Sequence, residues 1–369
     1  MARRTRVGVL LGGGSGERQI SLASGLMIAE HLPKQRYEAV LLDPLVLMAD
    51  NPKLPAALRE RARALRDGNH TPEALGTGDA ALPEALREQI ERASAAAAPA
   101  TRALALAGGE RGVDVVFIAL HGPWGEDGTL QGLLELVGVP FVGSGTLASA
   151  LAMDKAMAKT VLGARGLPVP ADVEVTRAEW KACPAAALER AGAVLPAVVK
   201  PVRQGSSIGM SLAGDPESLR GALEEALRHD SRALVEERLS GVELSVGVLG
   251  NRELQALPPI EIVPKRSFFD YRAKYDASLS DEICPARIGE ALAAEVQELA
   301  LAAHRALGCR GLSRTDMIAD AERGVRVLEV NTMPGMTVNS LLPKAAKVAG
   351  IDFPELLDRL VRLALEPED

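Results

Sequence analysis

Short apolar runs that alternate with helical stretches constrain the fold of this chain most strongly. Three such runs, residues 6–11, 37–43 and 113–120, lie in the first part of the sequence, and a glycine loop and a helical pattern reaching His31 follow the first run. Runs of this kind are typical of parallel strands that are buried on both faces. The sequence therefore predicts a doubly wound α/β domain at the start of the chain.

Residues 44–112 interrupt this alternation. Ala, Arg, Glu and Pro dominate the segment. It contains helical stretches at 54–66 and 82–93, and a short alanine run follows the second of them. Such a composition does not continue a buried sheet. We interpret it as a helical insertion in the first domain, facing mostly solvent.

The later part of the chain mixes strand and helix patterns. A helix is predicted at 148–162, after the loop Gly143–Thr146. The other predicted elements are strands at 197–200, 233–236, 243–249 and 324–330 and helices at 290–307 and 353–365. Periodicity alone does not show how these elements are grouped.

The charge and cysteine content exclude several classes of protein. The 369 residues include 42 Lys and Arg against 49 Asp and Glu, a net charge of −7, without the basic face of a nucleic-acid binder. No stretch reaches the about 20 apolar residues of a membrane span, and no signal peptide is recognised. Cys183, Cys284 and Cys309 are too widely spaced for a disulfide framework or a zinc site. We expect a cytoplasmic protein with no nucleic-acid or membrane partner.

Two glycine-rich loops invite a nucleotide-binding interpretation, but neither is a standard motif. In the loop Gly12–Glu17 a carboxylate stands where a dinucleotide fingerprint needs its third glycine. The chain has no Gly-Lys dipeptide, which excludes a P-loop. The loop Gly205–Gly209 keeps the amides and hydroxyls of a phosphate cradle but has no lysine, and a hairpin turn is the alternative interpretation.

Polar residues at strand ends point to a different kind of nucleotide site. Lys200 closes an apolar strand five residues before Gly205, so a phosphate bound there would meet a cation and backbone amides. Glu329 and Asn331 are two apart at the end of another strand and face the same way. With Asp316 they offer the oxygens that Mg²⁺ prefers. These residues together predict a magnesium–nucleotide site without a P-loop.

Seven sequence strings, in this order, resemble those of bacterial D-alanine–D-alanine ligases of the ATP-grasp superfamily. They are Gly14-Ser-Gly-Glu-Arg-Gln-Ile-Ser21, residues 119–132, Gly143-Ser-Gly145, Met153-Asp-Lys155, Lys200-Pro with residues 205–209, residues 269–275, and residues 329–337. The resemblance extends from about residue 6 to residue 365, apart from the insertion. It implies an α/β ATP-grasp fold with three parts: an N-terminal parallel-sheet domain (1–144) and two α+β domains (145–236 and 237–369) that sandwich ATP.

The resemblance also implies a nucleotide site. Lys155 and Lys200 would hold the ATP phosphates, Lys274 would reach the transferred phosphate, and Ser206 and Ser207 would lie in the loop that closes over them. The remaining nucleotide and metal positions would be Glu236, Glu237 and Leu239 around adenine, Glu243 on the ribose, and Asp316, Glu329 and Asn331 as ligands of two Mg²⁺ ions, which Mn²⁺ could replace.

The family's reaction is the joining of two D-alanines through an acyl phosphate, for peptidoglycan synthesis. Glu17, helped by His121, would pair with the first ammonium, and Glu17, Ser206 and Tyr275 would form a triad that closes the site. Arg314 and the Gly335 amide would stabilise the oxyanion, and Ser340 and Leu341 would receive the second carboxylate. A homodimer is also implied. The alternatives are a ligase that uses D-lactate or D-serine as its second substrate and a non-catalytic nucleotide-binding regulator. Tyr275 favours D-alanine, because family members that form the ester resemble one another in lacking this tyrosine.

Several polar residues also have a purely structural interpretation. His121 follows an apolar strand, where a buried structural histidine is common, although the glycine-rich acidic run behind it favours function. We interpret His31, His70, His229 and His304 as surface or structural residues, because no metal-ligand spacing connects them. Adjacent side chains diverge, so Glu126 and Asp127 are interpreted as turn residues and not as a catalytic pair.

Overall fold

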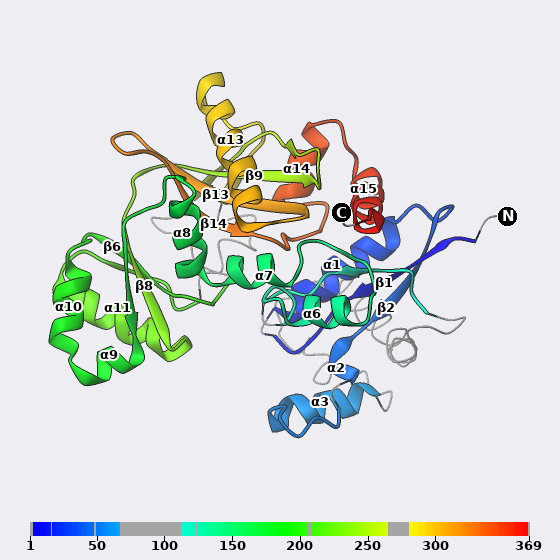
Figure 1. Ribbon diagram of the computed structural model, residues 1–369, viewed down its shortest axis with the longest axis horizontal. Helices are drawn as coiled ribbons and strands as arrows, with labels where there is room; N and C mark the ends of the chain where they lie inside the picture. Colours follow the sequence, from blue (N-terminus) through cyan, green and yellow to red (C-terminus); the bar gives the residue numbers. More distant parts are fainter. Residues whose placement is uncertain are drawn as a thin grey trace.

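The computed structural model describes residues 3–15, 17–47, 49–66, 112–122, 124–205, 208–264 and 280–367. Figure 1 shows three β-sheets arranged side by side, each with its own helices. The predicted helix at 82–93 and the site candidates Ser206, Ser207, Lys274 and Tyr275 lie outside the described residues.

The N-terminal sheet has four parallel strands in the order β2-β1-β3-β4. The strands are β1 (Thr5–Leu10), β2 (Tyr37–Leu42), β3 (Val115–Ile118) and β4 (Phe141–Val142). One face packs against α1 (Arg18–His31) and α15 (Phe353–Leu365), and the other against α6 (Thr129–Leu136). Helices cover both faces, so the predicted doubly wound domain is confirmed.

The central sheet is antiparallel, in the order β5-β8-β6-β7. Its strands are β5 (Asp172–Thr176), β6 (Ala197–Pro201), β7 (Ser211–Ala213) and β8 (Arg232–Glu237). The helices are α9 (Arg177–Ala182), α10 (Pro184–Gly192) and α11 (Pro216–His229). Leu219, Leu223 and Leu227 of α11 are buried with Val199 and Val235 of the sheet. The Gly205–Gly209 loop therefore connects an antiparallel pair, β6 and β7.

The third sheet is the largest, in the order β12-β11-β9-β13-β14, with β10 paired to β9. Its strands are β9 (Gly241–Gly250), β10 (Gln255–Ala256), β11 (Ile260–Pro264), β12 (Ser280–Ile283), β13 (Gly311–Asp320) and β14 (Gly324–Asn331). The helices α13 (Glu290–Leu307) and α14 (Leu341–Val348) pack on it. The predicted helices at 290–307 and 353–365 are confirmed to the residue, whereas β13 was not predicted.

The single helix predicted at 148–162 is wrong. The chain forms two helices, α7 (Thr146–Met153) and α8 (Lys155–Ala164), and Asp154 separates them. The Asp154 carboxylate accepts the Met157 N–H at 3.2 Å and so caps α8, and it also pairs with Arg203 and Arg232. A capping side chain of this kind starts a new helix even where the apolar pattern continues.

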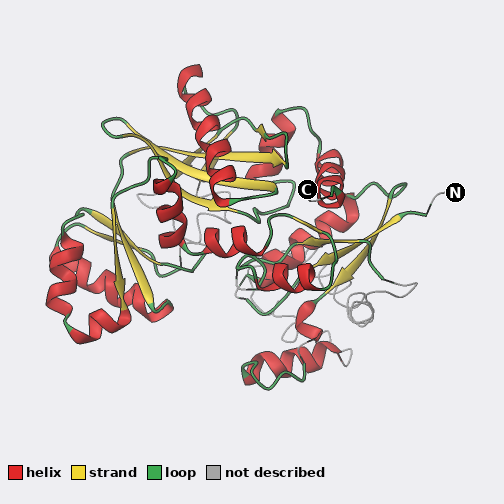
Figure 2. Ribbon diagram, in the orientation of Figure 1, coloured by secondary structure: helices red, strands yellow, loops and turns green. Residues whose placement is uncertain are grey.

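Two helices pack against a sheet of a different predicted domain from their own. Helix α8 buries Ala158 and Leu162 against the third sheet, although it was assigned to the central range. Helix α15 buries Leu356, Leu360 and Val361 in one core with the N-terminal sheet. The N-terminal and third sheets therefore share apolar packing, and Figure 2 shows α15 beside the N-terminal strands.

The insertion begins with two helices in the described residues. Helix α2 (Pro44–Leu47) and helix α3 (Ala56–Arg66) bury Leu45, Leu54 and Leu65 in a small separate core. Residues 44–47 and 49–66 are called the α2–α3 unit below. The unit projects beyond the N-terminal sheet in Figure 1.

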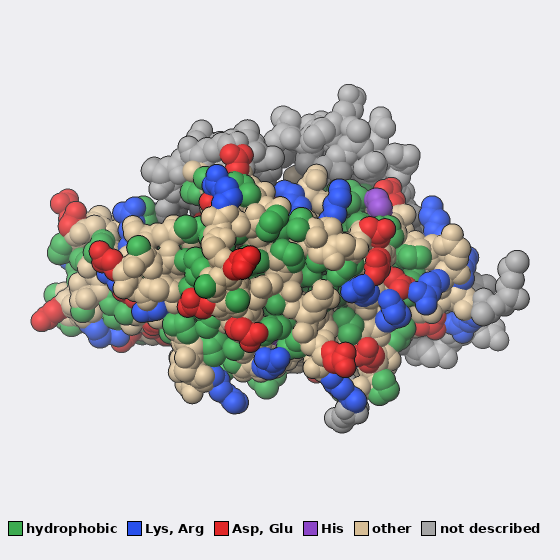
Figure 3. Space-filling view, turned by 90° about the horizontal axis from the view of Figure 1, so that it is seen from above, with side chains coloured by type: hydrophobic (Ala, Val, Ile, Leu, Met, Phe, Trp, Pro, Cys, Tyr) green, Lys and Arg blue, Asp and Glu red, His purple; other side chains and the backbone are tan. Residues whose placement is uncertain are grey.

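The cysteines, the surface charges and the helix lengths of the described residues complete the description of the fold. Cys183, Cys284 and Cys309 are free. On the face shown in Figure 3, basic and acidic side chains are interspersed and are not gathered by sign. A search of the helices in the described ranges finds no candidate transmembrane segment.

His304 of α13 is a buried structural histidine, as predicted, and it should make stability depend on pH. Its Nδ1 lies 2.7 Å from the Ser313 hydroxyl, and burial, with the nearby Arg305 charge, lowers its pKa to about 4. An unfolded histidine binds its proton near pH 6.5, so His304 contributes stability above that pH and loses it as the pH falls towards 4. The loss amounts to about 3 kcal/mol.

Thermal melting between pH 7.5 and 4.5 measures this effect. The melting temperature of the wild type should fall more steeply with acidity than that of His304→Gln. Equal slopes for the two proteins would contradict the assignment, whatever the difference between them at neutral pH.

Candidate functional site

A buried ion cluster joins the central sheet to α8. Lys200 at the end of β6 forms an ion pair with Glu236 on the neighbouring strand β8. Lys159 of α8 lies 2.7 Å from Glu236 Oε1 and 2.7 Å from Asp172 Oδ2, and its side chain is 3% exposed. Both carboxylate oxygens of Glu236 therefore contact a lysine.

The charges of this cluster hold each other in the ionised form. Burial would raise the pKa of Glu236, but Lys200 and Lys159 outweigh burial and lower it. Burial would likewise lower the pKa of Lys200, but Glu236 and Glu329 raise it. Lys200 is thus a permanent cation at the end of a buried strand, where the sequence predicted one.

Lys155 connects the central sheet to the third sheet. It is the first residue of α8, and its Nζ donates a hydrogen bond to the Gln204 carbonyl at 2.9 Å, next to the glycine–serine loop. The same Nζ lies 3.4 Å from Glu329 Oε2 on β14. One lysine therefore faces both the predicted phosphate loop and a predicted metal ligand.

Four polar side chains share one face of the antiparallel pair β13–β14. Arg314 is opposite Asn331, and Asp316 is opposite Glu329, with an irregularity after Asp316. Opposite residues in such a pair project to the same side. Arg314 donates to both Asp316 oxygens, from Nε at 2.9 Å and from Nη2 at 2.7 Å, and Ser245 of β9 donates to Oδ1 at 2.7 Å.

This donor set fits a magnesium ion. Two carboxylates and one amide oxygen, from Asp316, Glu329 and Asn331, are hard ligands of the type Mg²⁺ selects. Each carboxylate already contacts a basic side chain, Arg314 for Asp316 and Lys155 for Glu329. Among the described residues no group of three or more His, Cys, Asp or Glu is placed to hold a metal ion, and this set contains only two carboxylates. Three protein oxygens would leave coordination positions for phosphate and water, which Mg²⁺ usually retains.

The residues predicted around the base and ribose lie where β8 leads into β9. Glu236 faces the lysines, whereas the adjacent Glu237 accepts the Ala171 N–H at 2.9 Å and lies 3.4 Å from Arg323. Leu239 is half-buried in the connection. Glu243 is two residues before Ser245 on β9 and projects to the same face. The Glu237 side chain thus points away from the Lys200–Glu236 pair.

The loop Gly12–Glu17 is built to support a helix. Gly12 N–H donates to the Ser21 hydroxyl at 2.9 Å, and Gly13 N–H donates to Asp43 at 3.1 Å. Asp43 also forms a buried ion pair with Arg18 at 2.6 Å. Because these amides already have partners in the protein, the loop does not present them to a pyrophosphate.

Glu17 and His121 are brought together by two adjoining loops. A Cβ added at Gly122 would lie 3.1 Å from Glu17 Oε2, and one added at Gly205 would lie 3.9 Å from the same oxygen. His121 Nδ1 lies 3.9 Å from Glu126 Oε1. Burial would lower the pKa of His121, but Glu126 and Glu17 outweigh burial and raise it. This cluster places Glu17 between His121 and the glycine–serine loop.

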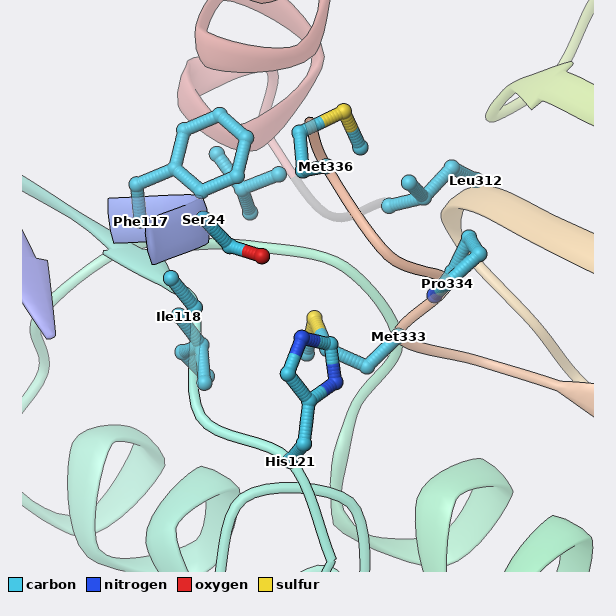
Figure 4. Close-up of a pocket in the computed structure, with 10 residues that line it drawn as sticks. Ser24, Phe117, Ile118, His121, Leu312, Met333, Pro334 and Met336 are labelled. Atoms are coloured by element: carbon cyan, nitrogen blue, oxygen red, sulfur yellow. The ribbon is translucent and has the colours of Figure 1, made fainter. Parts of the chain in front are cut away.

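Figure 4 shows His121 beside a small cavity. The cavity, about 10 Å³ in volume, is lined mainly by apolar side chains, among them Phe117, Met333 and Met336. His121 Nε2 and Ser24 Oγ, which both line it, are buried without a hydrogen-bond partner among the described residues. Apolar side chains therefore surround the Nε2 edge of the His121 ring, while Nδ1 faces Glu126.

Gly335 and Ser340 meet in the loop between β14 and α14. A Cβ at Gly335 would lie 3.0 Å from Ser340 Oγ, which also accepts the Thr337 N–H at 3.1 Å. Ser340 directly precedes α14, and Leu341 is its first residue. The loop thus groups three of the residues expected around the substrate carboxylates.

Glu126 and Asp127 are turn residues, as predicted. Glu126 accepts the Gly122 N–H at 2.6 Å, and Asp127 accepts the N–H groups of Trp124 and Thr129 at 2.9 and 3.0 Å. The sequence analysis did not single out Lys159, Asp172 or Ser245, which contact predicted site residues. Lys159 is four residues after Lys155 on one helix, and this spacing was the available signal.

The three sheets, with Lys200 of the central sheet and Lys155 of α8 facing carboxylates of the third sheet, define an ATP-grasp protein, and the predicted fold class is confirmed. Two family models match the chain: "D-ala D-ala ligase N-terminus" over residues 6–144 and "D-ala D-ala ligase C-terminus" over residues 161–362.

Curated relatives and solved structures agree with these matches. The D-alanine–D-alanine ligase of Pelotomaculum thermopropionicum is 40% identical over 366 residues, covering 98% of this chain and 97% of the relative. That of Syntrophobacter fumaroxidans is 42% identical over 362 residues, with the same two coverages. The chain belongs to the D-alanine–D-alanine ligase family.

Among solved structures, the D-alanine–D-alanine ligase of Bacillus anthracis has a TM-score of 0.72 at 31% identity, covering 98% of this chain and 97% of that one. The VanG D-Ala:D-Ser ligase of Enterococcus faecalis has a TM-score of 0.76 at 31% identity, covering 98% of this chain and all of that one.

Proposed function

We propose that this protein joins two D-alanine molecules at the expense of ATP, through D-alanyl phosphate, and so supplies a peptidoglycan precursor. The observation that carries the proposal is the meeting of Lys155 and Lys200 with the Asp316–Glu329 pair, in a chain of this family. The products besides the dipeptide are ADP and phosphate.

Lys200 and Lys155 are the proposed partners of the ATP phosphate groups. Lys200 and Lys155 are paired with Glu236 and Glu329 in the structure, and a triphosphate would compete with these carboxylates for the lysine ammonium groups. Ser206, Ser207 and Lys274 complete this part of the proposal as loop and phosphate contacts. Glu236, Glu237 and Leu239 are proposed at the adenine and Glu243 at the ribose.

Asp316, Glu329 and Asn331 are proposed to hold two Mg²⁺ ions, which Mn²⁺ can replace. Bound there, the ions would neutralise charge on the phosphates and on the group being transferred. The protein's own contribution is to present three oxygens from one face of a rigid strand pair, with Ser245 and Arg314 orienting Asp316.

The remaining residues bind the two amino acids. Glu17 is proposed to pair with the first ammonium beside His121, and Ser206 and Tyr275 to join Glu17 in a triad that excludes water. Arg314 and the Gly335 N–H are proposed to stabilise the oxyanion of the tetrahedral intermediate, since such preorganised donors act on charge as it develops. Ser340 and Leu341 are proposed to receive the carboxylate of the second D-alanine.

A D-alanine–D-serine ligase is the second candidate, because one structural neighbour carries that name. The names of the curated relatives, at about 40% identity, favour D-alanine. Incubation with ATP, Mg²⁺, D-alanine and an equal concentration of D-serine or D-lactate, followed by mass analysis, tests the choice. We expect D-alanyl-D-alanine as the main product; a predominant mixed product would favour the alternative.

We further propose that the protein is a cytoplasmic homodimer. Leu136 of α6 and Leu147 of α7 are 84% and 72% exposed, on helices that pack against each other. Apolar groups exposed together in this way often mark an interface. Light scattering should give twice the 38.8 kDa of one chain, and a mass of one chain at micromolar concentration would contradict the dimer.

Lys159→Met is expected to weaken ATP binding selectively. When Lys200 turns to a phosphate, Lys159 is the cation left beside the buried Glu236 carboxylate, and a buried charge without a partner is costly. We expect the KM for ATP to rise about tenfold, equivalent to about 1.4 kcal/mol, with little change in the KM for D-alanine.

A double-mutant cycle with Glu236→Gln provides the control. If Lys159 acts through Glu236, its substitution should add little once Glu236 is neutral. Fully additive effects, or an equal rise in both KM values, would contradict this role.

A further inference from the structure

Trp124 has an unusual backbone conformation beside the site. It is the only non-glycine residue in the described part of the chain with a positive φ, of 75°. This region is costly for a bulky residue and persists where the surroundings fix it. The Trp124 N–H donates to Asp127 at 2.9 Å, and its carbonyl accepts the Leu130 N–H at 3.3 Å. The surrounding turn thus holds this conformation.

The Trp124 ring joins the α2–α3 unit to the Gly12–Glu17 loop. A Cβ added at Gly14 would lie 3.0 Å from Trp124 Cζ3 and 3.3 Å from Leu58 Cδ1 of α3. Trp124 and Leu58 both pack on the small core of the unit. Gly14 therefore allows the close approach, and the Trp124 ring and Leu58 contact the Gly12–Glu17 loop on the side of the insertion.

Trp124 belongs to the loop that carries His121, and its ring meets the loop that carries Glu17. The two loops touch a second time at Gly122, where an added Cβ would lie 3.5 Å from Ser15 Cβ as well as near the Glu17 carboxylate. The α2–α3 unit thus contacts the Glu17 loop through Leu58, and Trp124 connects the unit to the His121 loop.

We propose that Trp124 is a positioning residue and that the α2–α3 unit, through Trp124 and Leu58, clamps the Glu17 and His121 loops and so sets the affinity for the ammonium of the first amino-acid substrate. This inference rests on the proposed function and deepens it. It assigns a role to the start of the insertion, although the insertion supplies no group that takes part in the reaction.

The physical reason is the short range of an ion pair. The ammonium must meet Glu17 while His121 stays beside it, and displacement of binding groups by about 1 Å can cost about 10²-fold in rate or affinity. The described residues of the two loops, 11–15 with 17 and 119–122 with 124–128, form no helix or strand before α1 and α6 begin. Contact with the packed apolar core of the α2–α3 unit holds both loops in position.

Substitution of Trp124 tests the proposal by a comparison of substrates. ADP release is measured against D-alanine concentration, fitted for two D-alanine sites, and against ATP concentration. Trp124→Ala should raise the constant for the first D-alanine about tenfold. Leu58→Ala should raise it several-fold, and Trp124→Phe should restore most of the affinity. The KM for ATP should change less than about twofold in each variant.

Leu223→Ala, in the core of the central sheet, is the control for general loss of stability. It should not change the first D-alanine constant selectively. An unchanged constant in Trp124→Ala and Leu58→Ala, or an equal loss for ATP and D-alanine, would overturn the inference. If Trp124→Ala fails to fold, Leu58→Ala decides. Absence of D-alanine-dependent ADP release by the wild type would instead refute the proposed function.

Discussion

Glu329→Gln is expected to lower kcat by at least about 10³-fold, equivalent to about 4 kcal/mol of transition-state stabilisation. Glu329, on β14, is opposite Asp316 and 3.4 Å from Lys155. Its carboxylate is therefore both a proposed metal ligand and the partner of a proposed phosphate-binding lysine. The amide keeps the shape of the side chain but removes its charge. The loss should therefore appear in turnover, not in folding.

ADP release at saturating ATP, D-alanine and Mg²⁺ measures this loss. Glu355→Gln, which removes a carboxylate paired with Arg359 on α15, is the matched control and should retain wild-type kcat. The melting temperature of both variants shows whether the fold is intact. A kcat near that of the wild type in Glu329→Gln would refute the metal assignment.

Arg314→Met is expected to lower kcat by about 10² to 10³-fold, the effect of losing one donor to an oxyanion. The Arg314 guanidinium is largely buried and fixed by two hydrogen bonds to Asp316, so it is positioned before any substrate arrives. A donor that is positioned in advance should stabilise the transition state more than the bound substrates. The KM for ATP should change much less than kcat.

Arg314→Lys separates charge from geometry. Lysine keeps the charge but not the planar fork that bonds both Asp316 oxygens, so intermediate activity is expected. If Arg314→Met instead raised the KM for ATP and left kcat unchanged, Arg314 would be a nucleotide-binding residue and the oxyanion role would be wrong.

Helices with strong end signals could be predicted to the residue. Helix α15 begins after Asp352, which accepts the Glu355 N–H, and has proline in its first turn. Helix α13 ends at Gly308, whose φ of 69° suits glycine. The break between α7 and α8 was missed although Asp154 is a normal capping residue, because apolar residues continue on both sides of it.

Strand β13 could not be recognised from its sequence, because two charged residues, Arg314 and Asp316, interrupt the apolar pattern of a buried strand. Arg314 and Asp316 project from one face of a largely buried strand, where a core strand would have apolar side chains. The register that places Asp316 opposite Glu329 depends on pairing between two strands, and no local pattern encodes it. The sequence therefore predicted these residues as candidate ligands of one site, but not the strand pairing that places Asp316 opposite Glu329.

Lys159 shows a different limit. A lysine in an exposed-looking helix is normally solvated. Its burial depends on Asp172 and on Glu236, which is 77 residues away, and on the packing of α8 between two sheets. Glu329 and Asn331, in contrast, could be identified as a pair because a spacing of two on a strand fixes their common face.

Product stoichiometry tests the central claim most directly. The protein is incubated with ATP, Mg²⁺ and D-alanine, and ADP and dipeptide are measured in the same sample, with L-alanine in a parallel sample. We predict one D-alanyl-D-alanine for each ADP released, with no turnover of L-alanine or in the presence of a chelator. ADP release without dipeptide, or no D-alanine-dependent ADP release at all, would contradict the account.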